Sequence, residues 1–357
     1  MTKSAKLPFI LEALLAAMLF GASAPLSKLL LGDAPPVLMA AFLYLGSGMG
    51  IALIKATQKL RGLQREAGLK RADIPWLAGA IISGGVAAPI VLMFSLENTP
   101  ASTASLLLNF EGVGTTIIAL VAFREAISGR AWAAILAITL AGILLSSNFS
   151  TDNAQGWGFS SGALGVIAAC TLWGLDNNFT RNISAKDPLA IVAWKGLLAG
   201  TFSLCLGILL GDTFPLLLTI LLIVLIGWVC YGLSTVLFVH SMRGLGAART
   251  SALYSIAPLA GVLLSIFILG EAPSLLLGLA ALLALGGAWL LVDETHMHSH
   301  VHTVLIHDHS HSHADPEHAH AHDSQVAVHT GMHEHPAQEH DHDHTPDIHH
   351  RHGHKPQ

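Results

Sequence analysis

Apolar stretches of about 20 residues follow one another along most of this chain, and they constrain its fold more than any other feature. A helix needs about 20 apolar residues to cross roughly 30 Å of hydrocarbon. Ten runs meet this length: 8–31, 35–54, 74–96, 99–122, 131–148, 159–180, 188–210, 215–239, 246–269 and 273–292. Only 11% of the residues are charged, whereas a soluble domain has roughly 25%. The sequence therefore predicts an all-α membrane protein with ten transmembrane helices.

The basic residues fall on one side of the predicted membrane, which supports this count. If the N-terminus is cytoplasmic, the loops on that side hold 14 Lys and Arg residues, and the opposite loops hold at most Lys28. A wrong count would scatter them over both faces, because cytoplasmic loops are the ones enriched in Lys and Arg. We therefore predict a multi-pass protein of the cell inner membrane with both termini in the cytoplasm.

The N-terminus leaves one alternative open. Residues 1–24 have a basic start, an apolar stretch and an Ala-Ser-Ala ending, which is typical of a cleavable signal peptide. The apolar character continues to Leu31, however, and an internal repeat makes this helix one of a matched pair. We interpret it as a retained transmembrane helix.

The two halves of the membrane part repeat each other. Glu125 and Glu271 both stand between two apolar helices, and an offset of 153 residues places Pro35 on Pro188. Because each half has five helices, an odd number, the second half is expected to enter the membrane from the opposite face. The predicted units are a first five-helix repeat at 1–148, a linker at 149–158, a second repeat at 159–292 and a tail at 293–357. Inverted repeats are a feature of secondary transporters, with substrate bound between the halves near mid-membrane; a duplicated scaffold without transport is the alternative.

Four motifs resemble a known transporter family. They are "FRE" at 123–125, "LGE" at 269–271, "LLLNFEGVGTTIIAL" at 106–120 and "LWGLDNNFTRNIS" at 172–184. They are similar to the EamA type of the drug/metabolite transporter superfamily, in a subgroup that often carries a His-rich C-terminus. The resemblance covers residues 8–292. It implies a secondary exporter of a small metabolite or drug-like solute, driven by an ion gradient or by exchange, and not an enzyme.

Ionisable residues inside the spans are the candidates for a substrate or ion pathway, because an unpaired charge at the bilayer centre costs several kcal/mol. Glu111 is the strongest candidate, since it lies halfway along its span, two residues after Asn109. Its carboxyl group could exchange a proton or hold a cationic substrate; a structural carboxyl tied to a neighbouring helix is the alternative. Lys195 lies about 10 Å along its helix, at 1.5 Å per residue. It could pair with Glu111 or extend to the cytoplasmic interface.

A polar cluster near the cytoplasmic end of span 159–180 adds further candidates. Asp176 and Asn177 follow Trp173 by three and four residues, and we include all three in the candidate pathway. Helix capping or a link to Arg181 is the simpler interpretation of this cluster.

Other polar residues are expected to have structural roles. Glu12 and His240 are expected at the membrane interface. The three cysteines do not have the spacing of a metal site or a redox pair, and we expect them to be small buried residues. They are Cys170, Cys205 and Cys230.

Histidine recurs at every second position in the tail, which holds 21 of the 22 histidines of the chain. The candidate metal ligands are His307, His309, His311, His313, His340, His342, His344, His349, His350, His352 and His354. Neutral imidazole with carboxylate suits Zn²⁺, Ni²⁺, Co²⁺ or Cu²⁺, so we predict that the tail binds divalent metal. With few large apolar residues it is expected to be disordered without metal. A solvated tail without metal function and a pH-responsive tail are the alternatives.

Three functions follow from these features. The leading one is an ion-coupled exporter with a metal-binding tail, and the others are a divalent-metal exporter and a non-transporting metal sensor or scaffold. Against the metal exporter, His240 is the only histidine outside the tail. Phosphate-binding and hydrolase motifs are missing from the sequence. We expect no required cofactor and no nucleic-acid partner; the expected partners are a small-molecule substrate, membrane lipid and divalent metal ions, and a homodimer is left open.

Overall fold

The structure is a computed structural model. It describes residues 3–61, 67–123, 129–146, 160–183, 186–245, 253–254, 256–292, 296–301, 305–312, 328–335 and 339–344. The predicted linker at 149–158 and Glu125 lie outside these residues.

The regular elements in the described part of the two predicted repeats are all helices. The first repeat contains α1 (Lys3–Leu30), α2 (Pro36–Leu60), η1 (Arg71–Asp73), α3 (Ile74–Ala80), η2 (Ile81–Ala87), α4 (Ala88–Glu97), α5 (Ala101–Leu107), α6 (Phe110–Phe123) and α7 (Gly129–Ser146). The second contains α8 (Ser161–Arg181), α9 (Pro188–Leu210), α10 (Leu217–Ile226), η3 (Gly227–Leu233), α11 (Ser234–Leu245), α13 (Ala257–Leu269) and α14 (Leu275–Val292).

The length and apolarity of these helices fit a membrane protein. Among the described residues, six helical runs are long and apolar enough to cross a membrane, from Leu7–Leu30 to Leu217–Phe238. Three shorter apolar helices lie at Trp132–Leu144, Ala257–Leu269 and Leu275–Gly287. The chain is therefore a multi-pass helical membrane protein, as predicted.

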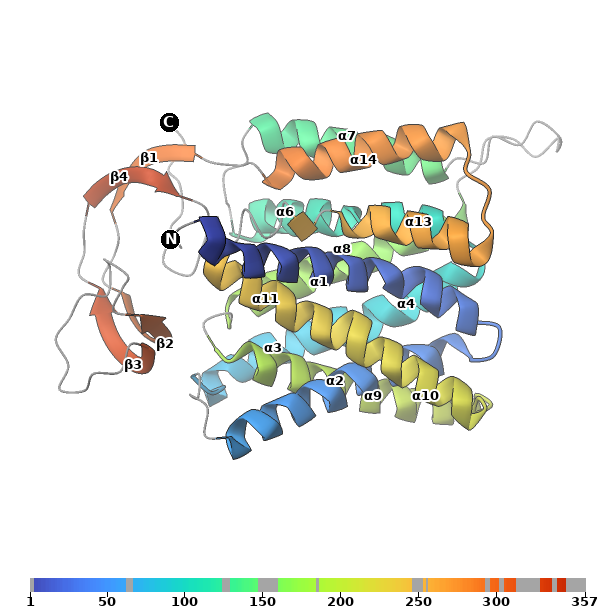
Figure 1. Cartoon of the computed structure of the whole chain (residues 1–357), viewed down its shortest axis with the longest axis horizontal. Helices are drawn as coiled ribbons and strands as arrows, with labels where there is room; N and C mark the ends of the chain where they lie inside the picture. The colour runs from blue at the N-terminus through green and yellow to red at the C-terminus, as the bar shows by residue number, and fades with distance from the viewer. Residues whose placement is uncertain are drawn as a thin grey trace.

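Helix packing repeats between the two halves. The equivalent helices α2 and α9 pack against each other, and so do α7 and α14, which lie side by side in Figure 1. In addition, α1 packs against α11 and α13, while α8 packs against α4 and α6. Each of these contacts joins a helix of one half to a helix of the other half.

Small residues allow α2 and α9 to come very close. A methyl group on Gly196 would lie 2.6 Å from the Cα atom of Gly48, so neither position accepts a side chain without moving the helices apart. Close backbone approach at small residues is a common basis of helix packing in membranes, where lipid is as apolar as the side chains.

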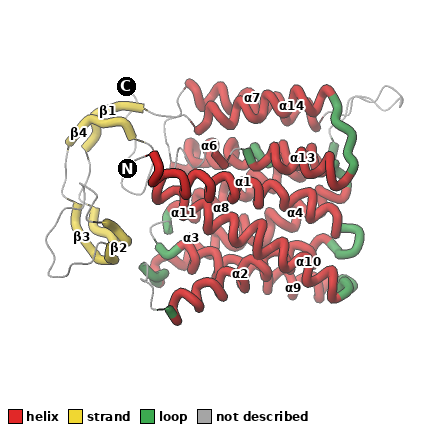
Figure 2. The backbone as a smooth tube through the Cα atoms, in the orientation of Figure 1, coloured by secondary structure: helices red, strands yellow, loops and turns green. Residues whose placement is uncertain are grey.

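Both the start of α1 and the end of α14 lie at the same end of the bundle, which we call the tail end (Figure 1). The loops that join α1 to α2, α4 to α5 and α13 to α14 lie at the opposite end, which we call the far end (Figure 2). This arrangement matches an even number of crossings.

The described part of the tail forms strands, whereas the sequence predicted disorder without metal. Strand β1 (His296–Val301) pairs antiparallel with β4 (Glu339–His344), and β2 (Leu305–Ser312) pairs antiparallel with β3 (Val328–His335). The alternation of His with Asp, Glu and Ser has the period of two that is typical of a strand, and pairing satisfies the backbone hydrogen-bonding groups. Of the predicted metal ligands, His313, His349, His350, His352 and His354 lie outside the described residues.

Candidate functional site

The candidate site begins with a break in a transmembrane helix. The span predicted at 99–122 is two helices, because α5 ends at Leu107 and α6 begins at Phe110. The Asn109 side chain donates to the Leu106 carbonyl at 3.1 Å, a local bond with which Asn competes against regular helix. Glu111 therefore lies in the first turn of α6. Broken helices whose half-helix ends point into the protein are a feature of transporter binding sites.

The second half is interrupted at the equivalent position. Helix α13 begins at Ala257, which is 146 residues after Glu111, and Pro258 occupies its first turn. Proline is accepted there because the first N–H groups of a helix have no partner inside it. The two breaks thus fall at matching points of the two halves.

Two π-helical turns also correspond. Element η2 begins at Ile81 and η3 begins at Gly227, again 146 residues apart. At the end of η2 the N–H of Ala88 donates to the carbonyl of Ser83, five residues earlier. The next residue, Pro89, has no N–H group. Such turns inside α-helices are frequent at functional sites. Four departures from regular helix thus occupy paired positions in the interior.

An amide of α8 holds the Glu111 carboxylate. Asn177 donates to Glu111 Oε1 at 2.8 Å and to the Thr115 hydroxyl at 3.2 Å, and Asn178 donates to the Thr115 carbonyl at 3.1 Å. These bonds join α6 to α8. The structure therefore brings together two of the predicted site residues, Glu111 and Asn177.

Asp176 forms an ion pair with Lys195 of α9. Asp176 is 2% exposed and also accepts a bond from the Thr180 hydroxyl at 3.0 Å. Its carboxyl group occupies the space beside Gly84 of η2, where any side chain would overlap it. The sequence left open whether Lys195 pairs with Glu111 or extends to the interface; in the structure its ammonium group pairs with Asp176.

The charges of the site do not cancel. Glu111 is bonded to Asn177, the residue that follows Asp176, and Lys195 pairs with Asp176. Two carboxylates thus share one ammonium group among the described residues of the site. When Glu111 is ionised the site has a net charge of −1, which a proton or a bound cation would neutralise.

Two aromatic side chains are fixed by the backbone of η2. The Gly84 carbonyl accepts a bond from the Tyr44 hydroxyl at 2.6 Å and from Trp173 Nε1 at 3.0 Å. Trp173 and the Asp176 carboxyl group thus both lie beside Gly84. Asn109, by contrast, bonds within its own segment.

The tyrosines of the site were missed by sequence reasoning. Tyr44, Tyr231 and Tyr254 are the three tyrosines of the chain; Tyr44 and Tyr231 are buried, each 8% exposed, and Tyr254 is half-buried. Tyrosine in membrane proteins is enriched at the interface, so tyrosine near mid-span was the signal that could have identified them.

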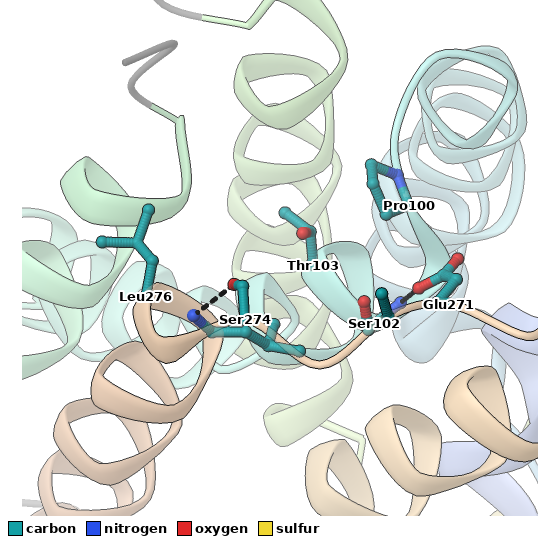
Figure 3. A pocket seen from close by; sticks show the side chains of 8 residues that line it. Pro100, Ser102, Thr103, Glu271, Ser274 and Leu276 are labelled. Atoms are coloured by element: carbon teal, nitrogen blue, oxygen red, sulfur yellow. Dashed lines mark hydrogen bonds between the residues drawn. The ribbon is translucent and has the colours of Figure 1, made fainter. Parts of the chain in front are cut away.

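A second group of charges is found at the far end. Glu271 accepts bonds from the N–H groups of Ala101 at 2.7 Å and Ser102 at 3.0 Å, and so caps α5 from the α13–α14 loop (Figure 3). Lys28 of α1 donates to the carbonyls of Leu96, Glu97 and Thr99. An anion at a helix start and a cation at a helix end both complement the helix dipole. The turn between α4 and α5 is therefore held from both sides.

The remaining predicted residues have local roles. Glu12 Oε2 lies 2.8 Å from His240 Nδ1 at the tail end of α1 and α11. Cys170 and Cys230 are buried as expected, but Cys205 is exposed on α9. In the part of the chain that the structure describes, no three His, Cys, Asp or Glu side chains come together as a metal site.

Known proteins match the whole membrane part. The EamA-like transporter family matches residues 7–147 and again 160–293. An "Uncharacterized transporter" of Methanothermobacter thermautotrophicus (strain ATCC 29096 / DSM 1053 / JCM 10044 / NBRC 100330 / Delta H) is 29% identical over 290 residues, which cover 77% of this chain and 83% of that protein. A solved crystal structure matches with a TM-score of 0.58 and 22% identity, over 81% of this chain and 96% of that one. The last similarity concerns the fold alone.

Proposed function

We propose, since this chain belongs to the EamA-like transporter family, that it is a proton-coupled secondary exporter of a small metabolite or drug-like solute. The observation that carries the proposal is the position of Glu111. It lies at a helix break in the interior, bonded to Asn177, beside an ion pair that leaves its charge uncompensated. A carboxyl group in this setting can hold either a proton or a cationic group. Exchanging one for the other couples the movement of protons across the membrane to the movement of the substrate.

Alternating access between two inverted five-helix repeats is the second part of the proposal. Matching helix breaks and π-helical turns in both halves support it, since rocking of one repeat against the other needs equivalent flexible points near a shared site. The charges of the far end also have counterparts in the sequence: Glu271 corresponds to Glu125, and Lys28 to Arg181. We propose that each pair of charges holds one end of the pathway closed in turn.

The orientation we propose places the tail end in the cytoplasm. The excess of Lys and Arg in the loops on that side supports it. The substrate would then enter from the end at which the tail is attached, which agrees with export.

Proteoliposomes with the purified full chain test the coupling. Vesicles are loaded with a pH-sensitive dye at acidic pH, diluted into neutral buffer and given one of three probe sets outside: the common amino acids, nucleosides, or the permanently charged benzyltrimethylammonium ion. We expect at least one set to raise the internal pH faster than in protein-free vesicles, because solute entry drives proton exit. If every set leaves the proton flux at the protein-free level, proton-coupled transport is contradicted.

We further propose that the tail binds divalent metal as a buffer or sensor beside the transport pathway. The register that sets His296, His298 and His300 opposite His344, His342 and His340 supports it, because opposite residues of an antiparallel pair have Cβ atoms about 5 Å apart. An isolated two-stranded ribbon is marginal in water, so bound metal would stabilise it. A metal exporter and a non-transporting sensor are the alternatives, and the lack of a ligand cluster in the described membrane part disfavours the first.

The full chain is expected to bind several equivalents of Ni²⁺ or Zn²⁺ at pH 7.5, and a chain truncated after Val292 is expected to bind none. Binding should weaken as the pH falls through about 6.5, because protons compete for the imidazole nitrogens. Calorimetry with both proteins measures this. If the two proteins bind the same number of metal ions, the tail does not bind metal.

Metal tolerance of cells then separates the alternatives. If truncation changes tolerance and Glu111→Gln does not, the tail acts as a buffer or sensor. If both raise sensitivity to the same metal, that metal is the substrate.

A further inference from the structure

The two strand pairs of the tail share one register. Strand β1 ends with Val301 opposite Glu339, and β2 begins with Leu305 opposite His335. Leu305 comes four residues after Val301, and His335 comes four residues before Glu339, so the second ladder continues the register of the first. The two strand pairs, drawn in yellow in Figure 2, are therefore stretches of one long antiparallel hairpin. Its outgoing arm contains β1 and β2, and its return arm contains β3 and β4.

Histidine stands opposite histidine along this hairpin. Of the six histidines in β1 and β2, five have a histidine as their partner, and we call each such pair a rung. The rungs are His296–His344, His298–His342, His300–His340, His307–His333 and His311–His329. The exception is His309, which stands opposite Gly331 between the last two rungs. Because successive residues of a strand alternate between its faces, the rungs of each strand pair share one face.

The spacing of histidine changes at the same level on both arms. Histidine occupies even positions in β1 and odd positions in β2, and on the way back it occupies odd positions in β3 and even positions in β4. The change falls between β1 and β2 on one arm and between β3 and β4 on the other. A one-residue slip of the register would move every side chain of an arm to the other face. The two arms of the sequence thus match each other only in the register that the structure shows.

This register suits neutral imidazole. A slip of one residue would set the histidines of β1 opposite Glu339, Asp341 and Asp343 of β4, and protonated imidazole would favour that arrangement because opposite charges on facing residues are stabilising. The observed rungs would instead place like charges opposite each other if the imidazoles were protonated, which is destabilising. Neutral imidazole is also the form that binds a metal ion.

We propose that divalent metal ions close the tail into this hairpin by binding to its rungs. In the β1–β4 pair, an ion is held by the four histidines of two neighbouring rungs. In the β2–β3 pair, an ion is held by one rung together with His309. The inference rests on the proposed metal binding of the tail and adds the ligands and their pairing. Ligands that are all imidazole favour Zn²⁺, Ni²⁺ or Cu²⁺ over Mg²⁺ and Ca²⁺, which prefer oxygen.

The dimensions of the β1–β4 pair permit such a site. Facing residues have Cβ atoms about 5 Å apart, and neighbouring rungs are two residues apart, which is roughly 7 Å along a strand. The ring nitrogens lie further from the backbone than Cβ, so four of them can converge on an ion that binds each at about 2 Å. The described residues contain no preformed group of three ligands. The metal ion therefore assembles its site by drawing two rungs together.

Substitution of whole strands tests the pairing in the purified full chain. The β1, β2 and β4 variants each replace three histidines with asparagine, which stays polar but has no imidazole nitrogen. The replaced residues are His296, His298 and His300 in β1, His307, His309 and His311 in β2, and His340, His342 and His344 in β4. Calorimetry with Zn²⁺ at pH 7.5 counts the bound ions, and the chain truncated after Val292 gives the baseline.

The two six-histidine combinations are each other's matched control. The β1 and β4 variants should each lose about one ion, and combining them should lose no more, because both break the same strand pair. Combining the β2 and β4 variants breaks both strand pairs and should lose about two ions or more. In a chain that binds metal without pairing, the two combinations would lose the same number. That result would overturn the hairpin while leaving the metal binding of the tail intact, whereas a full chain that binds no more than the truncated one would contradict both.

Hydrogen exchange measures the pairing directly. With Zn²⁺ bound, the amides of β1 and β4 should exchange more slowly than without metal, because the ladder protects them. In the β4 variant the protection of β1 should also be lost, although β1 itself is unchanged. If β1 keeps its metal-dependent protection in that variant, its histidines bind metal without β4 and the proposal is wrong.

Discussion

Replacing Glu111 with glutamine is expected to reduce proton-coupled transport to the level of protein-free vesicles while the protein remains inserted and folded. Glutamine has nearly the same shape and keeps an oxygen that can accept the Asn177 bond. The free energy of unfolding should therefore change by no more than about 1 kcal/mol. The change removes the ability to exchange a proton and the charge that a cation would meet, so the pH dependence of transport should disappear with the flux.

The dye assay described above measures this effect in vesicles that contain equal amounts of each protein. Glu12→Gln is the matched control, because Glu12 is a second carboxylate in a transmembrane helix but pairs with His240 at the tail end. It should transport as the original chain does. If Glu111→Gln keeps full proton-coupled flux across the pH range, Glu111 is a structural residue and the proposed coupling is wrong.

Removing either member of the Asp176–Lys195 pair alone is expected to destabilise the protein by about 3–5 kcal/mol, because the remaining charge is left buried without its partner. Lys195→Met leaves the carboxylate of Asp176, which is 2% exposed. The double substitution Asp176→Leu with Lys195→Met removes both charges and should recover much of the loss, since a buried pair is often replaced by apolar residues at little net cost.

Denaturation in mixed detergent micelles, followed by tryptophan fluorescence, gives the four stabilities of the double-mutant cycle. Lys55→Met is the comparison, because Lys55 also pairs with a carboxylate, Asp187, but its side chain is 43% exposed. Lys55→Met should lower the free energy of unfolding by about 1 kcal/mol or less. If Lys195→Met is as stable as the original chain, the ammonium group does not pair with Asp176 in the folded protein.

Periodicity and length alone determined the class of fold. Ten apolar runs, basic residues on one side and the repeat of the two halves predicted the helical membrane protein, because the bilayer permits so few ways of satisfying the backbone. The family was predicted from four motifs that resemble the EamA type. The position of Glu111 in an apolar run also identified it as a candidate, because a charged group inside the membrane is costly and is usually kept for a function.

Only the tertiary structure decided which charged groups meet. Asp176 and Lys195 are 19 residues apart on two helices. Their pairing depends on how α8 and α9 rotate against each other, which the sequence of either helix alone does not determine. The cap that Glu271 gives to α5 joins residues 170 positions apart, so no local pattern could reveal it.

The breaks in the helices and the gathering of the tyrosines were decided in the same way. Residues 99–122 form one apolar run long enough to cross a membrane, yet α5 ends at Leu107 and α6 begins at Phe110. Between them the Asn109 side chain bonds the Leu106 carbonyl. Tyr44 and Tyr231 lie far apart in the sequence, and their ring centroids are 5.9 Å apart because α2 packs against η3. A sequence states which residues are unusual in a membrane, but the contacts between helices decide what those residues can do together.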